Sequence, residues 1–372
     1  MKQQREKQVN IAEPLLGGVL LALCVLILSW TMGKVLGVSG YVDYLLQLPF
    51  SVNFHQHFSL TSENVHKLFF LVGMLVSGFI SQGIGSLEAD GMGVVSEAPG
   101  SIALLLCGGF LVGLGTSLAN GCTSGHGLCG LTRGSKRSFM AVACFFASAV
   151  ATRGILRMIN GSDSVYLEIE KYEFTIGLNW LKIVWKRTSV AVIGIAVSMV
   201  FSWLSKIILG GNTNSILSGF GRCMIACNVG LLFAQGLAIS GMTNWRKIVS
   251  FLDLPWTAMR GDFSLAILFA AAVLPNILSH YIVSKTVKIP IFDSKWYFPV
   301  GRKVDRRLIL GSVIFGIGWA LCGICPGPAV AVLFPSIVSE VENWIGYWWL
   351  GYALGTFTET LFFLESKKKK IK

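Results

Sequence analysis

The sequence predicts an all-α polytopic membrane protein with about nine transmembrane helices, re-entrant broken helices and two inverted repeats. Three observations support this fold class: a strongly apolar composition, long apolar runs bounded by charged loops, and a duplicated motif that contains cysteine. Hydrophobic residues make up 53% of the 372 residues and charged residues only 13%, whereas a soluble domain carries about 25% charged residues. A soluble fold would have to bury several helices that are apolar on every side, so this class is excluded.

The transmembrane helices are predicted from apolar windows, because a helix that crosses the bilayer needs about 20 mostly apolar residues. The polar segment Met1–Asn10 precedes the first window. This window is longer than a signal-peptide core, so it is expected to remain as a span. The windows are Leu15–Val35, Leu68–Gly85, Ser101–Ala119, Ser138–Ala151, Ser189–Leu209, Cys223–Met242, Phe263–Val283, Leu308–Gly323 and Trp344–Leu364.

The net charge of +12 is interpreted as basic loops next to lipid, and no nucleic-acid partner is expected. The chain has no Walker A pattern and no dinucleotide fingerprint, which argues against ATP-driven pumping and against a nucleotide cofactor. Lys and Arg are in excess on the side that holds the carboxyl terminus, where Lys367–Lys370 lie. The positive-inside rule therefore predicts a cytosolic carboxyl terminus, and the plasma (cell inner) membrane is the expected location.

An internal repeat relates the two halves of the chain. Gly113-Leu-Gly115 lies six residues before Cys122, and Gly316-Ile-Gly318 lies six residues before Cys325. A second pair of matching segments contains a serine in each half, at Ser39 (Gly37-Val-Ser-Gly40) and at Ser240 (Ala238-Ile-Ser-Gly241). The two offsets agree within two residues, which indicates a duplication.

The repeat predicts how the chain is organised. Residues 11–160 form the first transmembrane repeat, 161–214 a charged connector with a linking helix, 215–365 the second repeat, and 366–372 a basic tail. If five spans precede the second copy, it enters the bilayer in the opposite orientation. Inverted repeats of this kind place the substrate near the midplane, between broken helices.

The first motif that carries chemistry is Asn120-Gly-Cys-Thr-Ser-Gly-His-Gly-Leu-Cys-Gly130. Its four glycines weaken helical continuity, and its polar residues cluster at the end of an apolar run. Broken backbone at membrane depth is tolerated only where it is buried or lines a cavity, so the segment is predicted to be a re-entrant turn beside a pathway. An ordinary glycine-rich loop at the membrane surface is the alternative.

The second motif, Cys322-Gly-Ile-Cys325-Pro-Gly327-Pro, interrupts an apolar stretch at the equivalent place of the second half. Its Cys-x-x-Cys spacing is also compatible with a redox pair or with half a zinc site. A structural zinc ion needs four ligands, and only Cys122, Cys129 and His126 are available to complete the set. A thioredoxin-like role needs a strand followed by a helix. Neither a metal nor a catalytic residue is therefore expected.

Opposed broken helices suit an anion, because their amino termini present free N–H groups and the positive end of the helix dipole. A buried thiol stays protonated at neutral pH, so it can donate S–H to a polarisable sulfur. His126 is expected to contribute a charge or a hydrogen bond, or to be structural. Arg133, Lys136 and Arg137 are expected either to attract anions to the mouth or to form a solvated cluster.

Gly121–Leu131 closely resembles the hallmark of the YeeE/YedE sulfur-transport family, and Ala238–Asn244 and Gly323–Pro328 resemble the second-half motifs of the same family. The chain is similar to a fusion of two half-size members. The resemblance implies an hourglass-like helical fold and the uptake of thiosulfate or a related sulfur species. It also implies that cysteines on the central path pass the anion on through S–H···S contacts. Cys122 and Cys325 match two of these cysteines, whereas the third position falls near Gly37–Gly40.

The leading hypothesis is a membrane carrier that imports a small sulfur-containing anion, most simply thiosulfate. A membrane thiol enzyme that handles sulfane sulfur, or a transporter of another sulfur or selenium species, is the alternative. Besides the anion and the lipid bilayer, a soluble cytosolic sulfur-handling protein is a candidate partner, with Thr243–Lys247 as its docking loop. The predicted substrate-binding residues are Cys122, Cys325, Gly121, Ser124, Gly125, His126, Ser39, Ser240 and Gly327, with Cys129 and Cys322 as secondary candidates.

Overall fold

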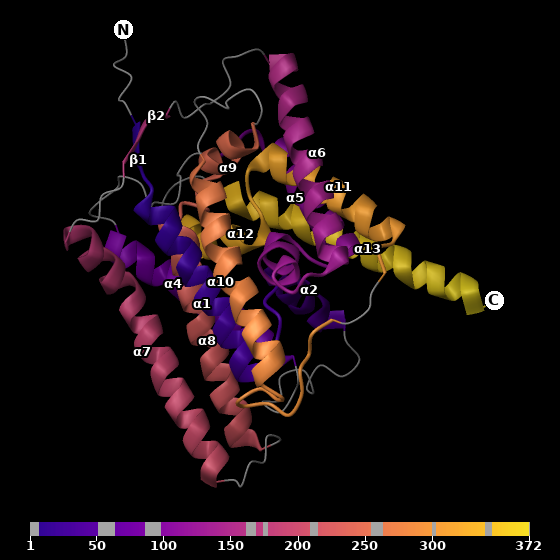
Figure 1. Ribbon diagram of the computed structural model, residues 1–372. Coiled ribbons are helices and arrows are strands. Elements are labelled where there is room, and N and C mark those ends of the chain that lie inside the picture. The colour runs from indigo at the N-terminus through magenta and orange to yellow at the C-terminus, as the bar shows by residue number, and fades with distance from the viewer. Residues whose placement is uncertain are drawn as a thin grey trace.

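Helices form almost all of the computed structural model (Figure 1). The structure describes residues 7–50, 64–85, 98–160, 169–173, 178–208, 215–253, 263–299, 303–338 and 344–371. The long helices are α1 (Ala12–Met32), α4 (Val65–Gly85), α5 (Ile102–Ala119), α6 (Lys136–Asn160), α7 (Leu178–Ile208), α8 (Ile216–Ile239), α10 (Ser264–Thr286), α11 (Arg306–Cys322) and α13 (Trp344–Ile371).

Short helices connect these long ones. They are α2 (Val38–Gln47), the 3₁₀ turn η1 (Leu48–Phe50), the π-helix η2 (Thr123–Leu131), α9 (Trp245–Leu252) and α12 (Pro326–Val338). Two short strands that the sequence did not predict, β1 (Lys7–Asn10) and β2 (Ile169–Glu173), pair in parallel. This pair joins the start of the first repeat to the connector.

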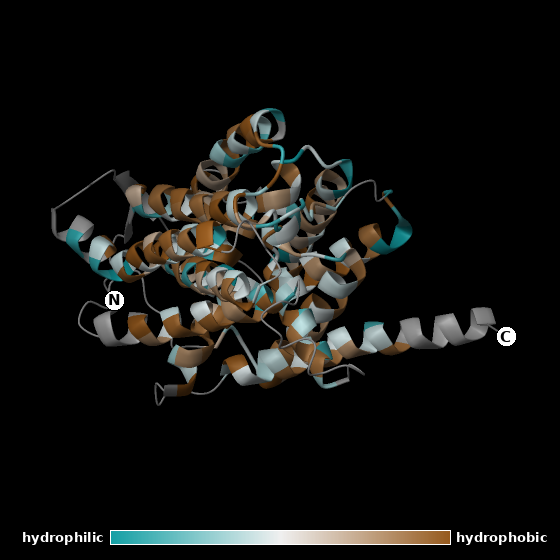
Figure 2. Cartoon of the chain, turned by 90° about the horizontal axis from the view of Figure 1, so that it is seen from below, coloured by the Kyte–Doolittle hydropathy of each residue, from teal (hydrophilic) through white to brown (hydrophobic). Residues whose placement is uncertain are grey.

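Each of the nine predicted windows falls on a long helix, so the polytopic fold class is confirmed. In the described part of the chain, 7 helices are long and apolar enough to cross a bilayer, and α4 and α13 occupy the other two windows. Large apolar side chains such as Ile193, Val197 and Val200 on α7 are exposed on the helix surfaces. Figure 2 shows this pattern, with brown helices and teal residues mainly at their ends and in loops. Such a surface is stable only against lipid.

The helices of the two halves pack in equivalent ways, so that replacing each helix by its counterpart in the other half gives the same main contacts. The exchange pairs α1 with α8, α4 with α10, α5 with α11, η2 with α12, and α6 with α13. Helix α4 packs on α8 as α10 packs on α1, and α13 packs on α5 as α6 packs on α11. Helix α12 packs on α4 as η2 packs on α10. Helix α7 lies outside this scheme and packs mainly on α8.

Equivalent helices run in opposite directions. On α1, Gly17 faces Ser240 near the end of α8, whereas the Cys24 thiol, further along α1, donates to the carbonyl of Val229, earlier in α8, at 3.6 Å. Helices α5 and α11 are antiparallel in the same way, since Gly108 faces Cys322 and Gly115 faces Gly311. Antiparallel equivalent helices are the signature of inverted repeats, so the predicted inversion is confirmed.

Small residues allow these helices to approach closely. A Cβ at Gly115 would collide with the backbone of Phe315, and one at Gly108 would collide with the Cys322 sulfur. Small residues at helix contacts are the usual means of packing in a bilayer, where the hydrophobic effect does not drive helices together. The close α5–α11 contact therefore fixes these two helices against one another, and a broken segment follows the carboxyl end of each.

Two expectations about local structure were wrong. The segments around Ser39 and Ser240 are not equivalent, because Ser39 lies in the first turn of α2 whereas Ser240 caps the carboxyl end of α8. Thr243–Lys247 is not an exposed loop, because Asn244 caps α9 and Trp245 is a buried residue of its first turn. Short sequence matches and charge did not reveal these helix boundaries.

Candidate functional site

The helical structure is interrupted sharply at the end of α5. Asn120 has a φ of 63° and Gly121 a φ of 156°, and the Gly121 N–H donates to the Thr116 carbonyl at 3.0 Å. A Cβ at Gly121 would lie 2.9 Å from Nε2 of His126, so glycine is required on steric as well as conformational grounds. The predicted interruption is confirmed, but it covers only these residues and Cys122. The rest of the motif is the π-helix η2 rather than an irregular turn.

The second half breaks in the same manner at the end of α11. Gly323 has a φ of 62°, and its N–H donates to the Trp319 carbonyl at 2.8 Å. Helix α12 then begins at Pro326, a residue favoured at the first helical position because it has no N–H to leave unpaired. Cys325 therefore precedes α12 as Cys122 precedes η2, and each thiol stands at the amino terminus of a helix.

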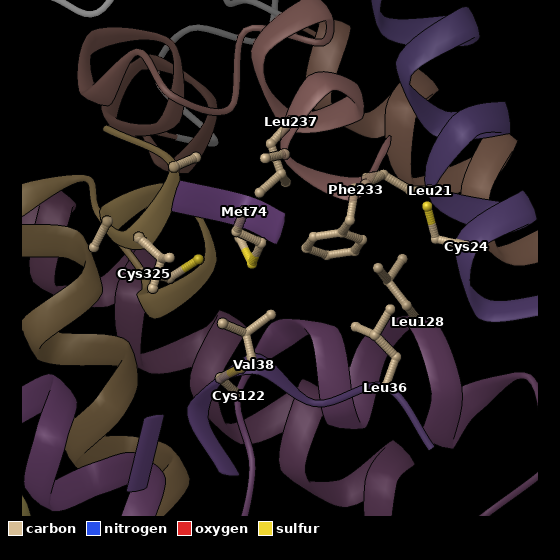
Figure 3. Close-up of a cluster of buried hydrophobic side chains, with 14 of the residues drawn as sticks. Leu21, Cys24, Leu36, Val38, Met74, Cys122, Leu128, Phe233, Leu237 and Cys325 are labelled. Carbon is tan, nitrogen blue, oxygen red and sulfur yellow. The ribbon is translucent and has the colours of Figure 1, made fainter. Parts of the chain in front are cut away.

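The two thiols are linked to one another through the start of η2. The Cys122 Sγ lies 3.2 Å from the Ser124 Oγ, and this oxygen accepts a hydrogen bond from the Val38 N–H of α2 at 3.1 Å. The Cys325 Sγ, from the other half, lies 3.6 Å from the Thr123 Oγ1. Both cysteines are buried. Figure 3 shows them beside the same apolar cluster, which includes Val38.

A cavity of about 600 Å³ lies on one side of this junction. The predicted site residues Ser39, Gly121, Gly125 and His126 line it. The predicted mouth cations Arg133, Lys136 and Arg137 also line it, so they stand beside the break rather than at a remote surface. We call this space the basic cavity. Its remaining walls are Val35, Leu36, Gly37, Gly40, Asn120, Ser135, Ser138, His280, Phe298 and Pro299.

A smaller cavity of about 40 Å³ lies next to Cys325. Thr123, Ser124, Cys325 and Gly327 line it. The other lining residues are Leu21, Leu128, Phe233, Leu237, Met242, Leu268, Phe269, Ala272 and Pro328, so we call it the apolar cavity. Ser124, whose hydroxyl contacts Cys122, belongs to this wall, whereas Gly121, the residue before Cys122, lines the basic cavity, so Cys122 lies between the two cavities along the chain.

His126 is held by the fold on both sides of its ring. Its Nε2 lies 3.3 Å from the Ala119 carbonyl, and its Nδ1 lies 3.1 Å from the Ser138 Oγ. A carbonyl can only accept, so Nε2 carries a proton, and in the neutral ring Nδ1 accepts from the Ser138 hydroxyl. His126 therefore positions the break, and neither ring nitrogen is directed at Cys122.

Two of the three cations of the basic cavity, Arg137 and Arg133, form hydrogen bonds with the protein. The Arg137 guanidinium donates to the Ala119 carbonyl at 3.3 Å and to Asp305 at 3.1 Å, which ties the end of α5 to the start of α11. Desolvation acts to raise the pKa of Asp305, but the Leu308 N–H and Arg137 outweigh it and hold that pKa below its ordinary value. The Arg133 Nε donates to the Cys129 carbonyl at 3.0 Å. Its Nη1 is buried and has no hydrogen-bond partner among the described residues.

Three predicted residues, Ser240, Cys322 and Cys129, form no hydrogen bond with either central thiol in the described part of the chain. The Ser240 Oγ donates to the Leu237 carbonyl at 2.9 Å and packs against Gly17. The Cys322 Sγ donates to the Leu104 carbonyl at 3.5 Å. Cys129 lines a small pocket that shares Arg133, His280 and Phe298 with the basic cavity. Cys322 and Cys325 contact different helices because the left-handed turn at Gly323 redirects the chain between them, and both are free thiols.

Two residues of the junction were not singled out from the sequence. Thr123 contacts the Cys325 thiol, and the Val38 N–H binds Ser124. Thr123 lies inside the first motif, and its hydroxyl beside Cys122 could have marked it as a candidate from the sequence. The backbone donor of Val38 has no signature in the sequence, since any residue type would supply it.

Comparison with known proteins assigns a family model to each half. Residues 2–151 match the model described as sulphur transport, and residues 222–344 match a family of unknown function, DUF6691. A probable transporter of Xylella fastidiosa (strain 9a5c) is 37% identical over 113 residues, which cover 30% of this chain and 75% of the relative. A second probable transporter of that strain is 34% identical over 139 residues, or 37% of this chain and 90% of the relative. Both relatives are less than half as long as this chain, which supports its two-part arrangement.

Proposed function

This chain belongs to the sulphur transport family and is an integral membrane transporter, and from that premise we propose that it imports thiosulfate or a closely similar sulfur anion. The observation that carries the proposal is that two buried thiols, Cys122 and Cys325, meet at the start of η2. Cys325 lines the apolar cavity, and Cys122 lies between Gly121 of the basic cavity and Ser124 of the apolar cavity. We further propose that uptake occurs across the plasma membrane, with the carboxyl terminus in the cytosol.

The basic cavity is suited to collect an anion. The Arg133 Nη1 has no partner in the described part of the chain, and a guanidinium binds oxyanions through parallel N–H groups. The Ser39 hydroxyl is buried and equally without a described partner. Ser39 lies in the first turn of α2, where helix N–H groups and the helix dipole favour negative charge. An anion that enters this cavity would satisfy donors that the fold leaves open.

The thiols are suited to the sulfur end of thiosulfate. The terminal sulfur is soft and polarisable, and soft ligands match soft partners. Each thiol also has a hydroxyl neighbour, Ser124 for Cys122 and Thr123 for Cys325. These hydroxyls can accept a hydrogen bond from the S–H group while no anion is present, and the S–H group can turn to donate to the anion when one arrives. We propose that the anion passes from the Cys122 thiol to the Cys325 thiol.

The alternative of a thiol enzyme is less well supported. A nucleophilic cysteine needs a base within hydrogen-bond reach. His126 is the histidine nearest to Cys122 in the motif, and both of its ring nitrogens are engaged elsewhere. The side chains hydrogen-bonded to the two thiols in the described structure are hydroxyls rather than bases.

The experiment is uptake of ³⁵S-thiosulfate by cells that lack their own thiosulfate transporters. Cells expressing the wild type should accumulate label, and Cys122→Ala should abolish the uptake at an equal amount of protein in the membrane. Cys322→Ala is the control, because it removes another buried thiol, from the second motif, that bonds to the Leu104 carbonyl away from the path. Wild-type uptake by Cys122→Ala would refute the proposed path. Mass spectrometry that detects a persulfide on Cys122 or Cys325 would favour the enzyme.

A further inference from the structure

Asp43 is an acidic residue on α2 that the proposed anion path does not use. The residue is half-buried, and its carboxylate accepts a hydrogen bond from the Tyr352 hydroxyl of α13 at 2.9 Å. The Tyr352 hydroxyl lies 3.3 Å from the Thr116 Oγ1 of α5. Tyr352 and Thr116 are both fully buried. An ionisable side chain among transmembrane helices is costly and normally serves a function.

Charged groups surround Asp43, and none of those described is close enough to form a salt bridge with it. Helix α4 contributes Lys67 and His66, and α13 contributes Glu359 in addition to Tyr352. The Lys67 ammonium lies over the ring of Tyr44 at 4.9 Å from its centroid. Glu359 pairs with Arg307 at 3.9 Å. Helices α5 and α12, which also pack on α2, contain no charged residue, and η2 contributes His126, whose ring is hydrogen-bonded to Ala119 and Ser138. Among the described residues, no basic group forms a salt bridge with Asp43.

The contacts of Asp43 lead directly to the anion site. Helix α2 carries Asp43, and its first N–H, at Val38, binds the Ser124 hydroxyl beside Cys122. Thr116 lies at the other end of this series of hydrogen bonds. Its backbone carbonyl accepts a hydrogen bond from the Gly121 N–H at 3.0 Å, at the interruption after α5. A negative charge on Asp43 repels an anion at this break, and a proton on Asp43 removes that repulsion. Binding of a proton and binding of an anion therefore favour one another, and this coupling is reciprocal.

We propose that Asp43 is the proton-binding site that couples anion import to proton import, a step that rests on the proposed function. In each cycle a proton from the outer solution binds the Asp43 carboxylate, the anion passes the thiols, and the proton is released to the inner solution. No covalent bond changes other than this O–H bond. One proton cancels one of the two negative charges of thiosulfate. An inside-negative membrane potential therefore opposes the joint entry of the proton and thiosulfate less than it opposes the entry of the dianion alone.

The test uses the purified full chain in liposomes that contain a pH-sensitive dye, with the membrane potential clamped by potassium and valinomycin. An inward thiosulfate gradient should acidify the lumen of wild-type liposomes, and the initial rate of acidification should track ³⁵S entry. Asp43→Asn should retain exchange of labelled for unlabelled thiosulfate but lose the acidification. Glu13→Gln, which removes a half-buried carboxylate on α1 that does not act on Asp43, is the matched control and should acidify as the wild type does.

The outcomes separate this inference from the proposed function. Wild-type thiosulfate entry without acidification, or acidification by Asp43→Asn at the wild-type rate, would overturn the coupling and leave the transport function intact. Absence of ³⁵S entry into wild-type liposomes would overturn both. If Asp43→Asn does not fold, Tyr352→Phe provides the second test, because it removes the hydroxyl that donates to Asp43. It should displace the pH profile of uptake, and an unchanged profile would overturn the inference.

Discussion

The hydroxyl of Ser39 should contribute to transport at the expense of stability. Its side chain is fully buried in the first turn of α2, and its Oγ has no hydrogen-bond partner among the described residues. A buried polar atom without a partner costs about 1–3 kcal/mol, so Ser39→Ala should raise the free energy of unfolding by about 1 kcal/mol or more. A hydrogen bond to a charged group contributes about 1.5–3 kcal/mol. If Ser39 binds the anion, its loss should therefore lower kcat/KM for uptake about 10- to 100-fold.

Opposite changes in the two quantities are the distinctive result. The midpoint of thermal unfolding in detergent reports stability, and the initial rate of ³⁵S-thiosulfate uptake reports transport. Ser312→Ala removes another buried hydroxyl without a described partner, on α11. It should raise the midpoint and leave uptake unchanged. Ser240→Ala removes a hydroxyl that is bonded to the Leu237 carbonyl, so it should lower the midpoint and leave uptake unchanged. A lower midpoint in Ser39→Ala, or unchanged uptake, would refute the reasoning.

Two further substitutions test the break and the packing of α6. Gly121→Ala places a Cβ 2.9 Å from His126 Nε2 at a φ of 156°, so uptake should fall at least 10-fold. Normal uptake would mean that the break relaxes freely. Arg157→Ala leaves the buried Asp253 carboxylate without the guanidinium that lies 3.4 Å away. It should destabilise the protein by about 2–3 kcal/mol, below the usual range for a fully buried pair because part of Arg157 is exposed. An unchanged unfolding midpoint would contradict this estimate.

The long helices could be predicted because length and apolar composition alone define them. Helix α7 is an example, since a window at Ser189–Leu209 locates it without any knowledge of its neighbours. The two breaks were predicted for a similar reason. Gly121 and Gly323 are residues that adopt conformations unfavourable for other types, and the surrounding cysteines and prolines mark them as unusual in an apolar run.

What could not be predicted depends on contacts between distant segments. Ser240 resembles Ser39 in its neighbours along the chain, but only the helix boundary shows that it faces Gly17 instead of a cavity. Cys322 and Cys325 have the spacing of a redox pair, and only the turn at Gly323 shows that they contact different helices. Asp43 is a lone acid in an apolar stretch, so the sequence could have marked it as a candidate functional residue. Its bond to Tyr352, 309 residues away, was not.

The central claim is that two thiols recognise the soft sulfur of the anion, and discrimination between thiosulfate and sulfate tests it most directly. The two dianions have the same charge and similar shapes and differ in one atom, sulfur or oxygen. The measurement is the ratio of ³⁵S-thiosulfate entry to ³⁵S-sulfate entry in liposomes, for the wild type and for the double variant Cys122→Ser and Cys325→Ser. Serine retains the hydrogen bonds to Ser124 and Thr123 but replaces the soft donor. At about 1 kcal/mol for each contact, the preference for thiosulfate should fall about 10-fold or more. An unchanged preference in the double variant would contradict the account.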